Sequence, residues 1–388
     1  MVAWSFIYGM SQARLWAKTA AGLILCCHSL GQAASGDPLL EADLPPLSIW
    51  SQSVTLRAAS GYKDNVLLSH LGAQASAFWL TGLDAMVFRL PTDGREFSFM
   101  FSGEDIRYFS SPDADHEQTF FALAQGRVPL GDGWDLGLAA QYFYEDQVLD
   151  VSATETGLGT ILVRGHGLTL RPGLRRDLGH GVMLEVEFEA NRQYLAAPLD
   201  DYWEGGPKLA LRKSYGNRSE IGLSYEMDRR FYDHRPQLDE FGFELAGTSL
   251  AFQTQRTELL WHQNWDHDRH WGSTLRGGVD INRDNSSGYF DFKKYFVSAQ
   301  MSVDLGTWHF QPRAVFGVYD YDVQVAGFTD TSYFLRRKMT LLLNCRVEKQ
   351  LSRKLKVFGE VENERSQGNE DDDKYRVNRV FGGLSWDF

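Results

Sequence analysis

The chain ends in Val380-Phe381-Gly382-Gly383-Leu384-Ser385-Trp386-Asp387-Phe388. Counted back from the end in steps of two, one face carries Phe388, Trp386, Leu384, Gly382 and Val380, and the other carries mostly polar or small residues. Because successive side chains of a strand point to opposite faces, this alternation predicts a β-strand with one apolar face. On its own the stretch also fits an edge strand of a soluble β-sandwich, so the rest of the chain has to decide.

An alternating strand with an aromatic carboxy-terminal residue resembles the closing strand of Gram-negative outer-membrane β-barrels. In that family the terminal strand is the signal that the barrel-assembly machinery reads. The resemblance therefore implies that Trp386 and Phe388 form an assembly signal and that this machinery is a partner.

The amino terminus has the pattern of a secretory signal peptide. Arg14 and Lys18 precede an apolar run over 19–30, and small residues over 31–34 fit a cleavage site. The run is shorter than the roughly 20 residues of a membrane-spanning helix. We therefore predict a signal peptide over 1–34, a short periplasmic linker over 35–48 and a barrel over 49–388, which after cleavage resides in the cell outer membrane.

Composition excludes two classes of protein. A mean hydropathy of −0.34 with 43% hydrophobic residues is too polar for a helical membrane protein but suits strands that alternate lipid-facing and water-facing residues. The net charge of −12 argues against a nucleic-acid partner, which requires a basic face. Cys345 is the sole cysteine after residue 34, so no intramolecular disulfide is expected.

From residue 49 onward, alternating segments are separated by connections of two kinds. About sixteen strands are predicted, near 50–62, 74–90, 95–109, 118–128, 134–148, 160–174, 182–194, 203–214, 218–232, 248–264, 271–284, 292–305, 308–321, 332–349, 354–365 and 375–388. Connections after even-numbered strands are tight, as at 306–307, whereas those after odd-numbered strands are longer and more acidic, as at 366–374. The predicted fold is therefore all-β, a transmembrane antiparallel up-and-down β-barrel with short periplasmic turns and longer extracellular loops.

The alternation also assigns faces to the strands. In 182–190 the apolar residues share one parity and Glu185, Glu187 and Glu189 share the other. In 160–174 the parity slips, and we predict a β-bulge near 165–167. For the strands 74–90, 118–128 and 248–264, the alternation does not decide which face points inward.

The inward faces carry both signs of charge, so cross-strand ion pairs are expected. The candidate lumen-lining residues are Arg171, Arg175, Glu185, Glu187, Glu189, Lys208, Arg212, Arg313 and Arg346. Two interpretations remain open: a charged ladder that selects solutes, or a lattice of mutually neutralising charges that stabilises a water-filled lumen. Arginine binds planar anions bidentately, which would suit carboxylates or anionic sugars.

Two further clusters of acidic and histidine residues give weaker evidence for a binding site. The acidic stretch 369–373 lacks the spaced ligands of a calcium loop, so a solvated loop is the simpler interpretation. His262, His267 and His270 match no zinc spacing. No nucleophile or phosphate-loop motif is present, and we expect no enzyme activity, no cofactor and no metal.

The opening Gly61-Tyr62-Lys63-Asp64-Asn65-Val66 is similar to one seen in putative β-barrel porins and in barrels tied to exopolysaccharide secretion. Two functions follow as hypotheses: a porin-like pore for small polar or anionic solutes, or a barrel for exopolysaccharide export or within a larger envelope complex. For a pore, the constriction candidate is the loop 233–247 with Phe241 and Phe243, or else the segment 35–48 entering the lumen. Expected partners are outer-membrane lipid and lipopolysaccharide, polar solutes, and either further copies in a homotrimer or a periplasmic or envelope protein.

Overall fold

The computed structural model describes residues 48–388 apart from 92, 156–158 and 329–332. The predicted signal peptide and residues 35–47 of the predicted linker lie outside the described residues. In the part of the chain that is described, no helix is long and apolar enough to cross a membrane.

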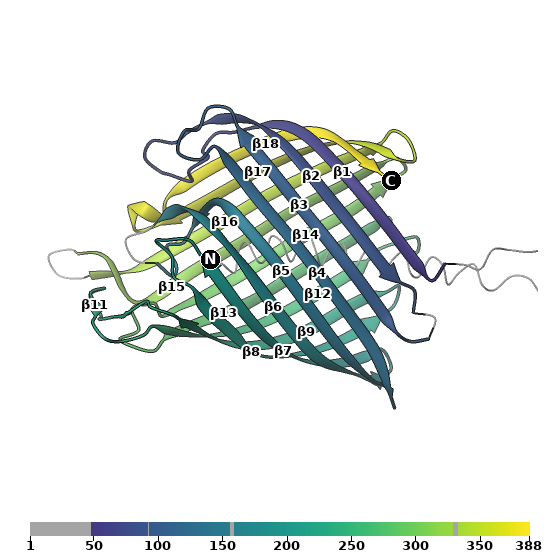
Figure 1. Cartoon of the computed structure of the whole chain (residues 1–388), viewed down its shortest axis with the longest axis horizontal. Coiled ribbons are helices and arrows are strands. Elements are labelled where there is room, and N and C mark those ends of the chain that lie inside the picture. Colours follow the sequence, from purple (N-terminus) through teal and green to yellow (C-terminus); the bar gives the residue numbers. More distant parts are fainter. Residues whose placement is uncertain (1–47, 92, 156–158, 329–332) are drawn as a thin grey trace, which may run out of the picture.

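Sixteen antiparallel strands form a closed barrel (Figure 1). Each strand pairs with its neighbours in sequence, and the small hairpin β10–β11 interrupts the order between β9 and β12. The barrel strands are β1 (Trp50–Lys63), β2 (Ser76–Arg89), β3 (Glu96–Tyr108), β4 (His116–Gly131), β5 (Trp134–Asp150), β6 (Thr160–Gly179), β7 (Val182–Leu195), β8 (Tyr202–Tyr215), β9 (Ser219–Tyr232), β12 (Ala251–Asn264), β13 (Trp271–Asp284), β14 (Phe292–Leu305), β15 (Trp308–Phe328), β16 (Tyr333–Gln350), β17 (Leu355–Gly368) and β18 (Tyr375–Asp387). The predicted all-β up-and-down barrel is confirmed.

The carboxy-terminal strand closes the barrel. β18 pairs with β1, with Trp386 opposite Leu56 and Val380 opposite Tyr62, and the Phe388 amide donates to the Val54 carbonyl at 2.9 Å. This pairing leaves no strand edge in the barrel. Trp386 and Phe388 point outward and are 46% and 64% exposed, as the alternation predicts.

The Lys63-Asp64-Asn65-Val66 stretch fastens the same seam at the opposite end. Asp64 accepts a hydrogen bond from the Asn378 amide at 2.7 Å, and the Asn65 side chain donates to the Arg376 carbonyl at 3.1 Å. Val66 is fully buried. These contacts tie the loop after β1 to β18.

The outer surface carries an apolar belt. Its exposed residues include Val186, Phe188, Leu209, Leu211 and Leu223, at 44–53% exposure, on three adjacent strands. Closed barrels satisfy every backbone hydrogen bond within the sheet, which is what allows β-structure to span a bilayer. The molecule thus has the architecture of a porin-like outer-membrane barrel.

The connections differ at the two ends, as predicted. Two residues join β14 to β15, and the His180-Gly181 turn between β6 and β7 has φ of 53° and 74°, the signature of a type I′ hairpin. The longer loops gather at the other end, on the left of Figure 1.

The predicted bulge near 165–167 is wrong. The register of β5 with β6 runs without a break from Trp134 opposite Arg176 to Asp150 opposite Thr160. Ile161 and Val163 lie on the inner face, in an apolar cluster with Val151. The apparent slip arises because this end of the strand packs inside the barrel mouth, whereas the rest of its apolar face points outward.

Candidate functional site

The predicted charges of β6 and β7 do meet inside the barrel. Arg171 Nε donates to Glu189 Oε2 at 2.6 Å, and the same guanidinium reaches Gln141 at 3.2 Å. Arg175 binds Asp135 on β5 at 2.6 Å. These are neighbouring-strand pairs, as the cross-strand argument expects.

The remaining candidates of β7 and β8 form looser pairs. Glu185 lies 3.7 Å from Arg127 and 3.6 Å from Arg212, and so bridges two strands. Lys208 lies 3.6 Å from Glu226 and is in register with Glu187.

Arg346 and Arg313 lie on neighbouring strands of another part of the wall. Arg346 on β16 binds Glu348 at 2.6 Å and Glu360 at 3.2 Å. Arg313 on β15 is in register with polar residues of both neighbouring strands, Gln300 and Asn344. Of the nine predicted lumen residues, Arg346 belongs to the lining of the cavity described below, and the other eight lie outside that lining. The role of the nine residues in selecting solutes stays a prediction.

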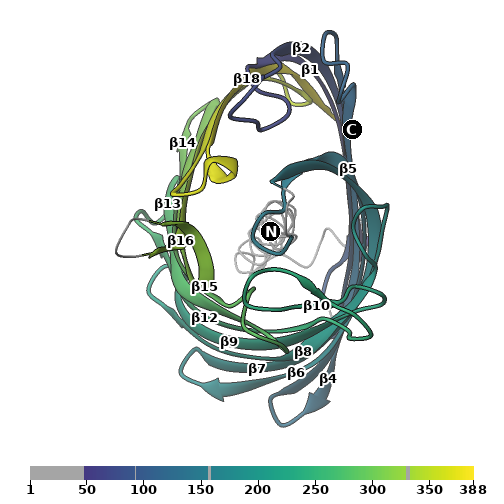
Figure 2. The same ribbon diagram turned by 90° about the vertical axis from the view of Figure 1, so that its left-hand side faces the viewer.

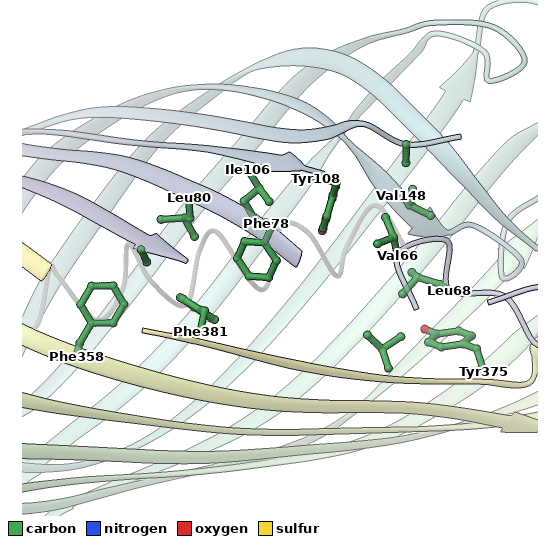
Figure 3. Packing of buried hydrophobic residues seen from close by; sticks show 13 residues of the cluster. Val66, Leu68, Phe78, Leu80, Ile106, Tyr108, Val148, Phe358, Tyr375 and Phe381 are labelled. Carbon is green, nitrogen blue, oxygen red and sulfur yellow. The ribbon is translucent and has the colours of Figure 1, made fainter. Parts of the chain in front are cut away.

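The inner wall near the β1–β18 seam carries an aromatic row that sequence reasoning missed. Phe358, Phe381, Phe78 and Tyr108 follow one another with ring centroids 5.8–6.2 Å apart (Figure 3). They belong to a buried cluster that also includes Leu80. The row explains why the parity of strand 74–90 is ambiguous, because β2 is apolar on both faces.

Cations cover this aromatic row. Arg346 stacks on Phe358 at 4.3 Å, Arg379 on Phe381 at 5.1 Å, and Lys63 on Tyr108 at 5.8 Å from the ring centroid. Such cation–π contacts hold guanidinium groups flat and leave their edges available for hydrogen bonds. In this part of the wall, cationic side chains therefore lie over buried aromatic rings.

A cavity of about 920 Å³ follows the inner wall. It is lined by Asp304 and Lys356 near the turn end and by Asp150 and Tyr375 near the loop end. The cavity therefore extends along most of the barrel.

The loop after β5 crosses the mouth. Figure 2 shows the end of β5 leaving the wall and turning into the opening. β16, which it reaches, lies seven strands away around the barrel in one direction and nine in the other. The contact thus joins almost opposite sides of the lumen and narrows it.

A buried network holds this loop. Lys338 of β16 donates to Asp150 and, at 2.8 Å, to Ser152 Oγ. Ser152 Oγ donates in turn to Asp373 at 3.1 Å, and Arg336 binds Asp373 and the Ser152 carbonyl, the latter at 3.0 Å. Lys338 and Asp373 are both fully buried. We call Lys338, Asp150, Ser152, Asp373 and Arg336 the latch.

Asp373 belongs to the acidic stretch 369–373, in the short 3₁₀ turn η1 (Asp371–Asp373). Burial alone would raise the pKa of this carboxyl, but the hydrogen bond from Arg336 and the charge of Lys338 outweigh burial and hold the pKa below its usual value. The simpler interpretation of a solvated loop therefore does not hold for Asp373, which is buried. Among the described residues no group of three or more side chains is placed to hold a metal.

The loop 233–247 contacts the crossing loop. Phe241 and Phe243 are 73% and 70% exposed. Its Arg235 binds Glu155 of the crossing loop at 2.7 Å. The loop thus supports the crossing loop through an arginine, and a direct constriction by the two phenylalanines stays a prediction.

No protein-family profile and no curated protein matches this chain. It is similar to solved barrels: OccAB1 of Acinetobacter baumannii (11% identity, 87% of this chain and 97% of that one, TM-score 0.48) and OprD of Pseudomonas aeruginosa (12%, 87% and 95%, 0.43). A bacterial polysaccharide outer-membrane secretin is also similar (11%, 86% and 97%, 0.41). At these identities, and with TM-scores below 0.5, the likeness carries no argument about function, which has to come from the side chains of the lumen.

Proposed function

We propose that this chain is an outer-membrane pore that passes small polar or anionic solutes through a charged lumen. The observation that carries the proposal is the inner wall, where a cavity extends along most of the barrel and its lining includes the ion-paired Arg57, Arg346 and Arg379 with their carboxylate partners. Barrels of sixteen or more strands are wide enough to hold an aqueous channel.

The outside of the barrel supports the placement in a membrane. Its apolar belt would be costly in water, whereas in lipid it is matched by hydrocarbon. A short-turn end and a long-loop end fit periplasmic and extracellular sides respectively. The predicted signal peptide would supply the export that this placement requires.

The arginines of the wall support the solute class. Arg57 binds Asp84 at 3.0 Å and Glu104 at 2.9 Å, and Arg379 lies 3.4 Å from Glu362. The cavity lining has more carboxylates than Lys and Arg side chains, and these ion pairs neutralise part of that excess, which suits neutral polar solutes. Guanidinium edges add planar donors that match carboxylates.

Liposome swelling tests the proposal. Liposomes with the refolded wild-type chain should swell in a small neutral sugar and in a carboxylate of similar size. Arg346→Gln combined with Arg379→Gln leaves Glu360 and Glu362 without these partners, so the swelling rate in the carboxylate should fall relative to that in the sugar.

Lys349→Gln is the matched control. Lys349 is on β16 with Arg346 but has the opposite parity and lies over the outward Trp308, 4.9 Å from its ring. Its rates should equal those of the wild type. A wild-type barrel that is folded but impermeable to both solutes would contradict the pore and favour export or assembly with an envelope partner.

A further inference from the structure

A second depression lies outside the lumen, at the loop end of β16, β17 and β18. It has a volume of about 900 Å³, and its lining includes Arg337, Arg365, Lys374, Arg376 and His70. Arg337, Arg365 and Arg376 have the outward parity of their strands, so the depression opens on the outer surface of the barrel.

Two of these arginines face each other. Arg365 of β17 and Arg376 of β18 are directly opposite in the ladder, and both are exposed. Like charges in this arrangement destabilise a sheet unless an anion lies between them. The pair is therefore an energetic cost that a bound anion would remove.

The chain itself does not provide that anion. Arg365 Nε donates to the neutral Asn363 Oδ1 at 2.9 Å, and within the described residues neither guanidinium has a carboxylate within 4.0 Å. Arg337 and Lys374 are paired, with Asp320 at 3.0 Å and Asp371 at 2.7 Å. Arg365 and Arg376 thus differ from their cationic neighbours and from the arginines of the lumen.

The position along the strands indicates what the anion is. Two residues further along the same face lie Asn363 and Asn378, joined at 2.7 Å, and two residues beyond them lie Val361 and Val380, 56% and 50% exposed. From the apolar belt toward the loops, this outer face therefore carries first valines, then asparagines and then arginines. The arginines therefore lie just beyond the hydrocarbon, at the level of lipid headgroups.

We propose that Arg365 and Arg376 bind a phosphate group of a lipid in the leaflet on the loop side, the phosphorylated glycolipid of the outer membrane. Arginine binds phosphate bidentately, and basic pockets at this depth suit anionic headgroups. This inference rests on the proposed placement in the outer membrane, but not on conduction through the lumen.

The test compares binding of phosphorylated and dephosphorylated lipid A to the refolded chain in neutral detergent, by native mass spectrometry. The wild type should bind the phosphorylated form at least tenfold more tightly. Arg365→Gln with Arg376→Gln should lose that preference. Arg95→Gln, an exposed arginine at the turn end, should keep it. Equal preference in the wild type and the double variant would overturn the proposal.

Two further arms separate the alternatives. Arg376→Glu creates an opposite-charge pair with Arg365, so it should unfold at the same or a higher temperature in neutral detergent while losing the lipid; retained lipid would overturn the proposal. Inorganic phosphate that binds the wild type as tightly as the lipid would show a free-anion site instead. A barrel that does not conduct, yet needs both arginines for lipid binding, would refute the pore and leave the lipid site standing.

Discussion

At the scale of single residues, the narrowing of the lumen depends on Lys338. Its side chain is fully buried and reaches Asp150 and Asp373, which are 2% and 0% exposed. A buried ion pair contributes little compared with an apolar pair, but removing one partner costs about 3–5 kcal/mol because the remaining charge is left uncompensated.

We therefore expect Lys338→Met to release the crossing loop. The buried carboxylates of Asp150 and Asp373 would lose the cation that they share. If the loop left the lumen, water could solvate these carboxylates instead. Single-channel conductance should rise while heat-modifiable migration on gels shows that the barrel is intact. Lys354→Met, an exposed lysine in a turn, should conduct like the wild type. Identical conductance in all three proteins would refute the latch.

The lowered pKa of Asp373 gives the latch a pH dependence of defined sign. Its carboxylate stabilises the docked loop above the unfolded pKa of about 3.8, and this contribution is lost as pH falls through the lower folded pKa. Conductance should be constant from pH 7 to about pH 4 and should rise below that. Asp373→Asn should already conduct more at pH 7 and show a smaller acid step. A rise in the wild type between pH 7 and pH 5 would contradict this assignment.

At the scale of elements, the two long loops have separable roles. The loop after β5 crosses the lumen, whereas Phe241 and Phe243 in the hairpin β10 (Gln237–Leu238)–β11 (Glu244–Leu245) are exposed. Loop length and aromatic content pointed to the hairpin. The crossing loop could not be identified from sequence, because its anchors Lys338 and Asp373 are distant in the chain and meet only after closure.

Excising each loop tests this distinction. Replacing 151–159 by Asn-Gly should raise conductance strongly, because the loop that carries Ser152 and Glu155 is then absent, although Asp150 at the end of β5 keeps Lys338 as its partner. Replacing 236–247 by Asn-Gly should change conductance much less, because Arg235 and its bond to Glu155 are retained. The reverse order of effects would make the phenylalanine loop the constriction.

The faces of the strands show what sequence can predict at this scale. β7 alternates apolar and acidic residues, so Glu185, Glu187 and Glu189 were assigned inward and are found there. β2 could not be assigned, since Phe78 and Leu80 on its inner face pack against Phe381 of β18 and other buried residues. Such packing depends on which strands face each other across the seam, and alternation within one strand does not contain that information.

At the scale of the whole molecule, closure follows from features that the sequence does contain. Sixteen alternating segments, connections of two lengths and an aromatic terminal strand together predict a barrel, and the ring of strands confirms it. These sequence features do not determine how the charged side chains pair inside the barrel. Ion pairs such as Arg171 with Glu189 follow from neighbouring strands, whereas the latch joins strands seven apart.

Single-channel conductance of the refolded chain in a planar bilayer, with the reversal potential under a salt gradient, shows directly whether the barrel is a charged aqueous pore. We expect steady, stepwise conductance, with an ion preference that moves toward anions in Glu187→Gln and toward cations in Arg171→Gln. A folded barrel without conductance, or a reversal potential that neither substitution changes, would contradict a charged aqueous pore.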